Sequence, residues 1–408
     1  MIPDSMSLQI FFKFLKKISV ESRVRERRPP STLHEELFRR QFRRLPSALE
    51  EELCRQFSLA ELRAATNNFA NDSIIGTGGH SLGSGYKGII DGGTLVAVKR
   101  CSRCSISSLD GIEYFRTEMK LICQLRHQNL VSLLGFCYEN GERMLVYEYM
   151  TNRALCDHLH AGADPLPWKR RLEICIGASR GLHYLHTGAK YLIIHHDIRS
   201  SNIRLDNKWT AKLADFGFSK IGSPSMSKPK PKVLTKMESL PSRNNGYMAP
   251  EYQMRGELTE KCDVFSLGVV LFEVLCGRLV KEFVNSKENV VFWISKCIKA
   301  GSIHDIIDPY LKGKLAPACL IEFVEIALSC VHPKASERPS IGEVEVKLEL
   351  ALELQEKADL VMKVVNPQGG YTYEEVPFRL SVSDYYEIWN NEYLSSPDNV
   401  SNGDCVSA

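Results

Sequence analysis

Four short motifs and one glutamate follow one another along the chain, and their order constrains the fold more than any other feature of the sequence. Val96-Ala-Val-Lys99 ends a β-type run, and Glu118 follows 19 positions later (118 − 99) on a stretch with helical spacing. The second half of the chain carries His195-His-Asp197-Ile-Arg199-Ser-Ser-Asn202, then Asp215-Phe-Gly217, then Ala249-Pro-Glu251. Each string is commonplace alone, but the ordered set is highly specific.

The secondary-structure pattern changes near residue 150. From about residue 70 to residue 150, β-type runs alternate with glycine-rich turns, and one helical stretch covers Tyr114–Leu125. After residue 150 helical patterns dominate, and Val264–Gly277 is apolar on nearly all faces, which indicates a buried helix. We therefore expect a mostly β unit followed by a mostly helical one.

The ordered motifs resemble the protein-kinase set. Three further stretches resemble plant receptor-like kinases, in particular the FERONIA-like receptor kinases and the Pto-like cytoplasmic kinases: Phe57–Phe69, Arg171–His186 and Leu258–Val264. The resemblance covers about residues 54–355. It implies an α+β, bilobal protein-kinase fold, with a small, mostly antiparallel β N-lobe containing one helix and a larger, mostly α-helical C-lobe.

This resemblance divides the chain into four parts. Residues 57–150 would form the N-lobe and residues 151–350 the C-lobe. Residues 1–56 would be a basic N-terminal arm, and residues 351–408 a C-terminal helix extension with an acidic tail.

The resemblance also implies roles for the matched positions in phosphoryl transfer. Lys99 would hold the α- and β-phosphates, Glu118 would fix Lys99, and Asp197 would accept the proton of the attacking hydroxyl. Arg199 would contact the transferring phosphate, while Asn202 and Asp215 would bind Mg²⁺ or Mn²⁺. Three further residues would have structural roles: Asp263 would brace the catalytic loop, and Glu251 and Arg338 would form an ion pair in the large lobe.

The nucleotide would be ATP. Its expected contacts are the glycine loop, the strand that ends at Lys99, and the backbone of the hinge between the lobes, with Tyr147 as the bulky residue behind the nucleotide. The residues are Gly76, Gly78, Gly79, Gly83, Ala97, Lys99, Glu148, Tyr149 and Met150.

Several positions depart from the family pattern. Two residues are inserted in the glycine loop around His80–Leu82, and Gly85 replaces the valine that covers adenine. His196 replaces an arginine that binds a phosphorylated activation loop, and a mostly uncharged imidazole lacks the bidentate fork. Arg199 replaces a lysine, and Asn244 stands where a hydroxyl is expected.

These departures leave two functions open. The first is an ATP-dependent serine/threonine kinase of the receptor-like cytoplasmic type, with reduced activity. The second is a pseudokinase that acts as an interaction scaffold, with or without nucleotide. The partners expected for the chain are protein substrates and receptor kinases or other signalling proteins.

The charge distribution adds a prediction about the ends. The net charge is +3, from 52 basic and 49 acidic residues, so a strongly basic nucleic-acid binder is not indicated. Residues 1–44 carry 11 Lys/Arg and 5 Asp/Glu (+6), whereas residues 366–408 carry 1 and 7 (−6). The basic arm is either solvated or a short amphipathic helix in weak contact with anionic membranes.

The remaining composition points to the cytoplasm. The sequence has no apolar run of about 18 residues, so no membrane-spanning helix is expected. The 13 cysteines lie in apolar contexts, which favours free buried thiols in a reducing compartment. Cys101-Ser-Arg-Cys104 lacks a second ligand pair, so it does not indicate a zinc site. We expect a cytoplasmic protein, peripheral at the plasma membrane if the arm binds lipid.

Overall fold

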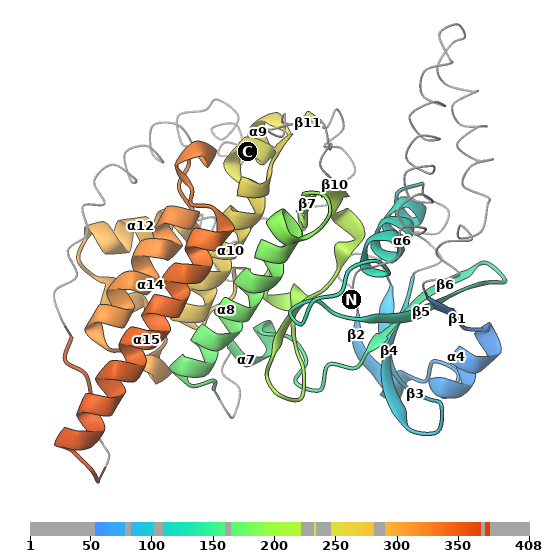
Figure 1. Cartoon of the computed structure of the whole chain (residues 1–408), viewed down its shortest axis with the longest axis horizontal. Coiled ribbons are helices and arrows are strands. Elements are labelled where there is room, and N and C mark those ends of the chain that lie inside the picture. The colour runs from blue at the N-terminus through green and yellow to red at the C-terminus, as the bar shows by residue number, and fades with distance from the viewer. Residues whose placement is uncertain are drawn as a thin grey trace, which may run out of the picture. The chain divides into compact units, whose positions relative to one another are not determined.

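The computed structural model describes residues 54–77, 83–101, 109–159, 165–221, 232–233, 246–280, 290–368 and 372–375. A β-sheet region with one long helix leads into a larger helical region (Figure 1). The predicted α+β, bilobal kinase fold is confirmed.

The N-lobe is built on a six-stranded sheet with the order β1-β5-β6-β4-β3-β2. Its strands are β1 (Arg55–Gln56), β2 (Ile74–Thr77), β3 (Ser84–Ile90), β4 (Thr94–Arg100), β5 (Leu133–Glu139) and β6 (Glu142–Glu148). The pair β1–β5 is parallel and the other pairs are antiparallel. The β3–β4 turn is made by Asp91, Gly92 and Gly93, all with positive φ, as the Asp-Gly-Gly string predicts.

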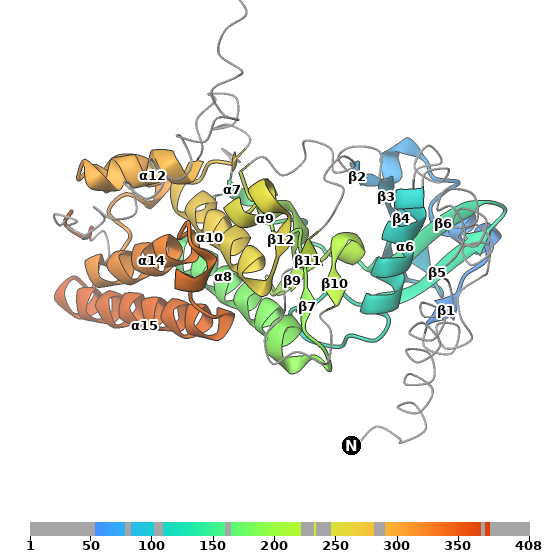
Figure 2. The same cartoon turned by 90° about the horizontal axis from the view of Figure 1, so that it is seen from above.

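Two helices pack on this sheet. Helix α4 (Leu59–Ala65) begins at a capping box in which Ser58 and Glu61 bond each other's backbone N–H, and it buries Leu59 and Leu62. Helix α6 (Leu109–Ile122) begins earlier than the predicted Tyr114 and ends before Leu125. Its buried residues recur at helical spacing, and Figure 2 shows it beside the sheet.

The C-lobe is organised around α10 (Glu260–Cys276), where every residue from Cys262 to Cys276 except Ser266 is buried. This burial confirms the predicted buried helix. Three long helices pack in the same region: α8 (Trp168–His183), α14 (Pro317–Cys330) and α15 (Ile341–Val365). Helix α15 continues past residue 350, where we expected the C-lobe to end.

Short elements complete the described fold. The helices are α7 (Cys156–Leu159), α9 (Pro250–Arg255), α12 (Val290–Lys299) and α13 (Ile303–Ile306), the 3-10 turns η1 (Asn71–Ser73), η4 (Ser200–Asn202), η5 (Phe216–Phe218), η7 (Pro309–Leu311) and η8 (Ala335–Glu337), and the π-helical turn η3 (Tyr184–Gly188). The two-stranded pairs are β7 (Ile193–Ile194) with β10 (Lys220–Ile221), β8 (Ile203–Leu205) with β9 (Ala211–Leu213), and β11 (Lys232–Val233) with β12 (Glu257–Leu258).

Among the described residues, no helix combines the length and the apolar character that a bilayer crossing requires.

Candidate active site

Three of the predicted residues meet where the sheet faces the C-lobe. Lys99 lies at the end of β4, Glu118 lies on α6, and Asp215 immediately precedes η5. Lys99 Nζ is 2.7 Å from Glu118 Oε2 and 2.5 Å from Asp215 Oδ1. One ammonium therefore contacts carboxylates that are far apart in the sequence.

The charges in this cluster stabilise one another. Burial alone would lower the pKa of Lys99, but Asp215 and Glu118 outweigh it and raise that pKa. Burial would raise the pKa of Asp215, but Lys99 outweighs it and lowers that pKa. Lys99 is thus protonated and Asp215 ionised near neutral pH.

Asp197 is held by its own loop. Asn202 Nδ2 donates to the backbone oxygen and to Oδ2 of Asp197, both at 2.8 Å. Arg199 Nη2 donates to the same Oδ2 at 3.1 Å. Burial raises the pKa of Asp197, and Arg199 opposes that effect. The five-residue spacing between Asp197 and Asn202 therefore brings these side chains together.

A buried carboxylate supports the backbone of this loop. Asp263 on α10 accepts hydrogen bonds from the backbone N–H of His195 (2.8 Å) and His196 (2.7 Å). His186 Nε2 also lies 2.9 Å from Asp263, a contact that the sequence analysis missed. Burial would raise the pKa of Asp263, but these hydrogen bonds lower it. The bracing contact expected of Asp263 is present.

The hinge residues follow β6. Ala97 pairs with Tyr147 across β4 and β6, and the Tyr147 hydroxyl donates to Glu118 Oε1 at 2.7 Å, a bond that the sequence did not reveal. The Glu148 carboxylate accepts from Ser132 N–H at 2.9 Å. The chain leaves the strand at Tyr149 and Met150, so the backbone here is outside the sheet ladder.

The glycine loop is described only at its two ends. Gly76 pairs with Gly85 across β2 and β3. Gly83 has φ +124°, and a Cβ at this position would lie 2.0 Å from the backbone oxygen of Arg100. Gly78, Gly79 and the insertion around His80–Leu82 lie outside the described residues. A Cβ on Gly85 would meet Ile75 at 3.4 Å, an ordinary contact, so the surroundings of Gly85 do not require a glycine.

His196 is enclosed where the family has an arginine. Its ring lies edge-on to Tyr252, with ring centroids 4.5 Å apart, and its backbone has φ +64°. Burial lowers the pKa of His196 to about 4, although Asp263 opposes this effect. The imidazole is therefore neutral at pH 7 and offers no positive charge to a phosphate. Asn244 lies outside the described residues.

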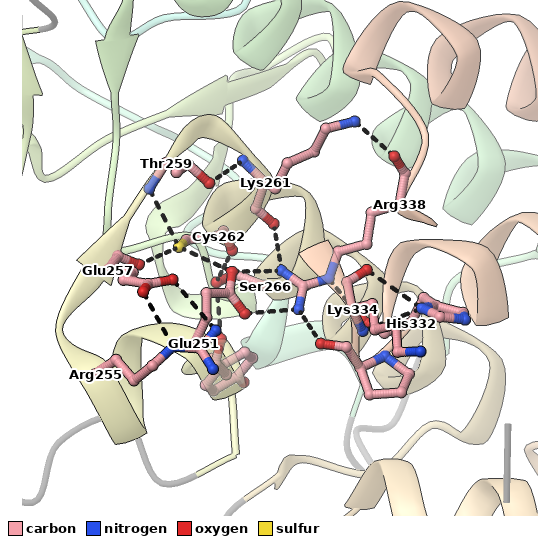
Figure 3. Close-up of polar contacts among 12 residues, drawn as sticks. Glu251, Arg255, Glu257, Thr259, Lys261, Cys262, Ser266, His332, Lys334 and Arg338 are labelled. Carbon is pink, nitrogen blue, oxygen red and sulfur yellow. Dashed lines mark hydrogen bonds and ion pairs between the residues drawn. The ribbon is translucent and has the colours of Figure 1, made fainter. Parts of the chain in front are cut away.

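The expected Glu251–Arg338 ion pair is bidentate and buried (Figure 3). Arg338 Nη1 and Nη2 donate to the two Glu251 oxygens at 2.7 and 2.8 Å. The other guanidinium bonds go to the carbonyls of His332, Lys261 and Pro333. This pair ties α9 to the segment before α15.

The donor set suits a magnesium ion. Mg²⁺ prefers oxygen ligands and in phosphoryl-transfer sites takes one or two protein ligands beside the phosphates. Asp215 supplies an ionised carboxylate and Asn202 an amide oxygen from the neighbouring loop. These residues fit the metal that protein kinases generally use with ATP.

Comparisons with known proteins agree with this fold. Residues 72–348 match the family model described as protein tyrosine and serine/threonine kinase. The chain belongs to this family of protein kinases. The resemblance to plant receptor-like kinases is also confirmed by the curated relatives.

Three of these relatives come from Arabidopsis thaliana. Receptor-like protein kinase FERONIA is 49% identical over 311 residues, which are 75% of this chain and 33% of the relative. ANXUR1 is 48% identical over 354 residues (84% and 40%), and THESEUS 1 is 47% identical over 315 residues (76% and 35%). The chain thus spans about a third of the length of the relatives that it matches.

Proposed function

We propose that this chain is an ATP-dependent protein serine/threonine kinase of the receptor-like cytoplasmic type, which transfers the ATP γ-phosphoryl to protein hydroxyls in plant signalling. The observation that carries the proposal is the contact of one ammonium, Lys99 Nζ, with both Glu118 and Asp215. This contact joins the N-lobe sheet to the loop before η5, and it would place the Lys99 ammonium beside the phosphates of ATP.

The proposed chemistry is mostly positioning and electrostatics. Lys99 would hold the α- and β-phosphates, with Glu118 keeping its ammonium in place. Asp197 would orient the substrate hydroxyl and accept its proton, and Arg199 would stabilise charge on the transferring group. When bound to Asp215 and Asn202, Mg²⁺ or Mn²⁺ would supply neutralisation of phosphate charge.

Two features support reduced activity. Gly85 lacks the side chain that would cover adenine, although its surroundings admit a Cβ. His196 is neutral and enclosed, so a phosphorylated activation segment would find no charge at that position. The first feature would weaken nucleotide binding, and the second would remove one means of activation.

The test is phosphoryl transfer by the purified full chain. Autophosphorylation and phosphorylation of a generic protein substrate are measured with Mg²⁺ and with Mn²⁺, by radiolabel and mass spectrometry. Asp197→Asn should lower the rate about 10²- to 10⁴-fold, because it removes the general base. Equal signal from wild type and Asp197→Asn would refute the kinase function. Phosphate found only on tyrosine would refute the serine/threonine assignment.

The second candidate is a pseudokinase scaffold, which the neutral His196 and Gly85 favour. It requires partner binding that is indifferent to Lys99→Ala and Asp197→Asn in folded protein. Partner complexes that vanish with these variants would exclude a scaffold independent of the site.

We also retain the expected organisation as part of the proposal. Residues 57–150 and 151–350 would be the two kinase lobes. The protein would be cytoplasmic, and residues 1–44, which lie outside the described residues, would bind anionic membranes weakly. Vesicle co-sedimentation that is unchanged after deletion of residues 1–44 would remove the membrane contact. Protein substrates and receptor kinases would be the partners.

A further inference from the structure

A tyrosine that carries no expected role lies inside the charged cluster. Tyr114 is on α6, one helical turn before Glu118, so both side chains leave the same face of the helix. Tyr114 is 4% exposed. Its hydroxyl donates to Asp215 Oδ1 and accepts a hydrogen bond from Lys99 Nζ at 2.9 Å.

The ring of Tyr114 is held in this position by η5. A Cβ on Gly217 would lie 2.1–2.3 Å from three atoms of the ring, so the ring packs directly on the glycine. Phe218 meets the same ring edge-on, with centroids 5.0 Å apart. The hydroxyl is therefore aimed at Asp215 by packing on both sides.

The contact occupies a lone pair of Asp215 that a metal ion could otherwise use. A carboxylate oxygen has about two lone-pair sites, and Asp215 Oδ1 already accepts from Lys99 and from Tyr114. Lys99 is expected to turn to the phosphates when nucleotide binds, but Tyr114 has no such second partner in the proposed mechanism. A cation that ligates Asp215 through Oδ1, alone or together with Oδ2, must compete with this hydroxyl.

We propose that Tyr114 competes with the divalent cation for Asp215 and so raises the metal concentration that nucleotide binding requires. The proposal rests on the proposed function, because it gives Asp215 the role of metal ligand. Tyr114 would then be a positioning residue that keeps Asp215 bonded within the protein until metal and nucleotide arrive together.

The experiment measures binding of a fluorescent ATP analogue at increasing Mg²⁺, and separately at increasing Mn²⁺, with the full chain. Tyr114→Phe keeps the ring against Gly217 and removes only the hydroxyl. The metal concentration for half-maximal binding should fall about 10-fold, the effect of losing one hydrogen bond to a charged group. An unchanged or higher metal requirement would overturn the proposal.

A neighbouring tyrosine gives a matched control. Tyr147 is also buried and also donates to a carboxylate of the cluster, but its partner is Glu118. Tyr147→Phe should change the metal requirement by less than about two-fold, since it frees no lone pair on Asp215. Equal shifts in Tyr114→Phe and Tyr147→Phe would show a general loosening of the cluster and overturn the proposal.

A measurement without nucleotide separates this inference from the kinase function. The melting temperature is followed against Mn²⁺ concentration, because a ligand that binds the folded state raises it. Tyr114→Phe should respond at about 10-fold lower Mn²⁺ than wild type. When Asp215→Asn is added to both proteins, the difference between them should disappear. If no variant binds nucleotide, the kinase function fails, while the Mn²⁺ response still supports or overturns competition at Asp215.

Discussion

Two ion-pair clusters differ in how far their charges are shielded from solvent. In the first, all five N–H donors of Arg338 are used, and the side chains of Arg338 and Glu251 are 0% and 5% exposed. In the second, Lys99 and Asp215 are each 23% exposed, and Lys99 serves two carboxylates. The charges of the first are enclosed by protein, whereas the Lys99 and Asp215 side chains of the second remain partly open to solvent and to anything that binds there.

The comparison separates a structural role from a functional one on physical grounds. A buried charge is tolerated only when its hydrogen-bond partners are present, and Arg338 meets that condition with carbonyls and one carboxylate. The three N–H donors of Lys99 are also used, on Glu118, Asp215 and Tyr114, but its side chain remains partly solvated. We therefore expect changes to Arg338 to act on stability and changes to Lys99 to act on activity.

The largest effect is predicted for Arg338→Leu. It leaves the Glu251 carboxylate buried without its cation, so the free energy of unfolding should fall by about 3–5 kcal/mol. Arg255→Leu is the control, because Arg255 pairs with Glu257 while its side chain is 59% exposed; its cost should be within about 1 kcal/mol. Urea denaturation measures both. Similar losses in the two variants would contradict the contrast.

The next effect is predicted for Lys99→Met. Loss of the phosphate-binding ammonium should lower phosphoryl transfer by about 10²- to 10³-fold. The buried Glu118 carboxylate would keep the Tyr147 hydroxyl as a donor, so the loss of stability should be smaller than in Arg338→Leu. The measurement pairs the kinase assay with urea denaturation. A Lys99→Met protein that keeps its rate, or that unfolds as readily as Arg338→Leu, would remove the distinction between the clusters.

A gain is predicted at the nucleotide side of the partly exposed cluster. Gly85→Val adds a side chain whose Cβ the surroundings admit, and it would cover apolar surface worth about 1.5 kcal/mol or more. Affinity for ATP should rise about ten-fold, measured by calorimetry or with a fluorescent analogue. Unchanged or weaker binding would show that a missing side chain at residue 85 does not limit affinity.

The smallest effect concerns pH. Burial lowers the pKa of His196 to about 4, whereas an unfolded histidine titrates near 6.5. The unfolded state therefore binds a proton first as pH falls, so stability contributed by neutral His196 is present at pH 7 and is lost between about pH 6.5 and 4. His196→Asn should lose about 1–2 kcal/mol less than wild type between pH 7 and 5 in urea titrations. Equal losses of stability in the two proteins would show that His196 does not cause this pH dependence.

The sequence predicted the fold and several contacts of the site because ordered motifs and periodicity carry that information. The expected partners Lys99 and Glu118 are in contact, and Asn202 bonds Asp197. Tyr114 was recognised only as part of a helical stretch. Its contact with Asp215 joins residues 101 positions apart, and neither periodicity nor a motif specifies how α6 packs on η5.

Other missed features have the same origin. The His186–Asp263 contact joins the π-helical turn η3 to α10, and such a turn has no clear pattern in the sequence. A helix extension is expected beyond residue 350, but the sequence pattern does not fix its end; α15 runs to Val365, and its last turns expose apolar residues. Tertiary packing, rather than local preference, decides these details.

The course of the chain after the family match has a practical consequence for protein production. Beyond residue 348, Ala351 and Gln355 of α15 are buried, and Gln355 Oε1 accepts the Ala316 N–H at 2.9 Å. Tyr373 then returns to the lobe, where its N–H donates to Gly313 and its hydroxyl donates to Asp359 at 2.7 Å. An expression plasmid that stops at the family boundary would uncover the base of α14, so soluble yield should depend on keeping the chain through Glu375.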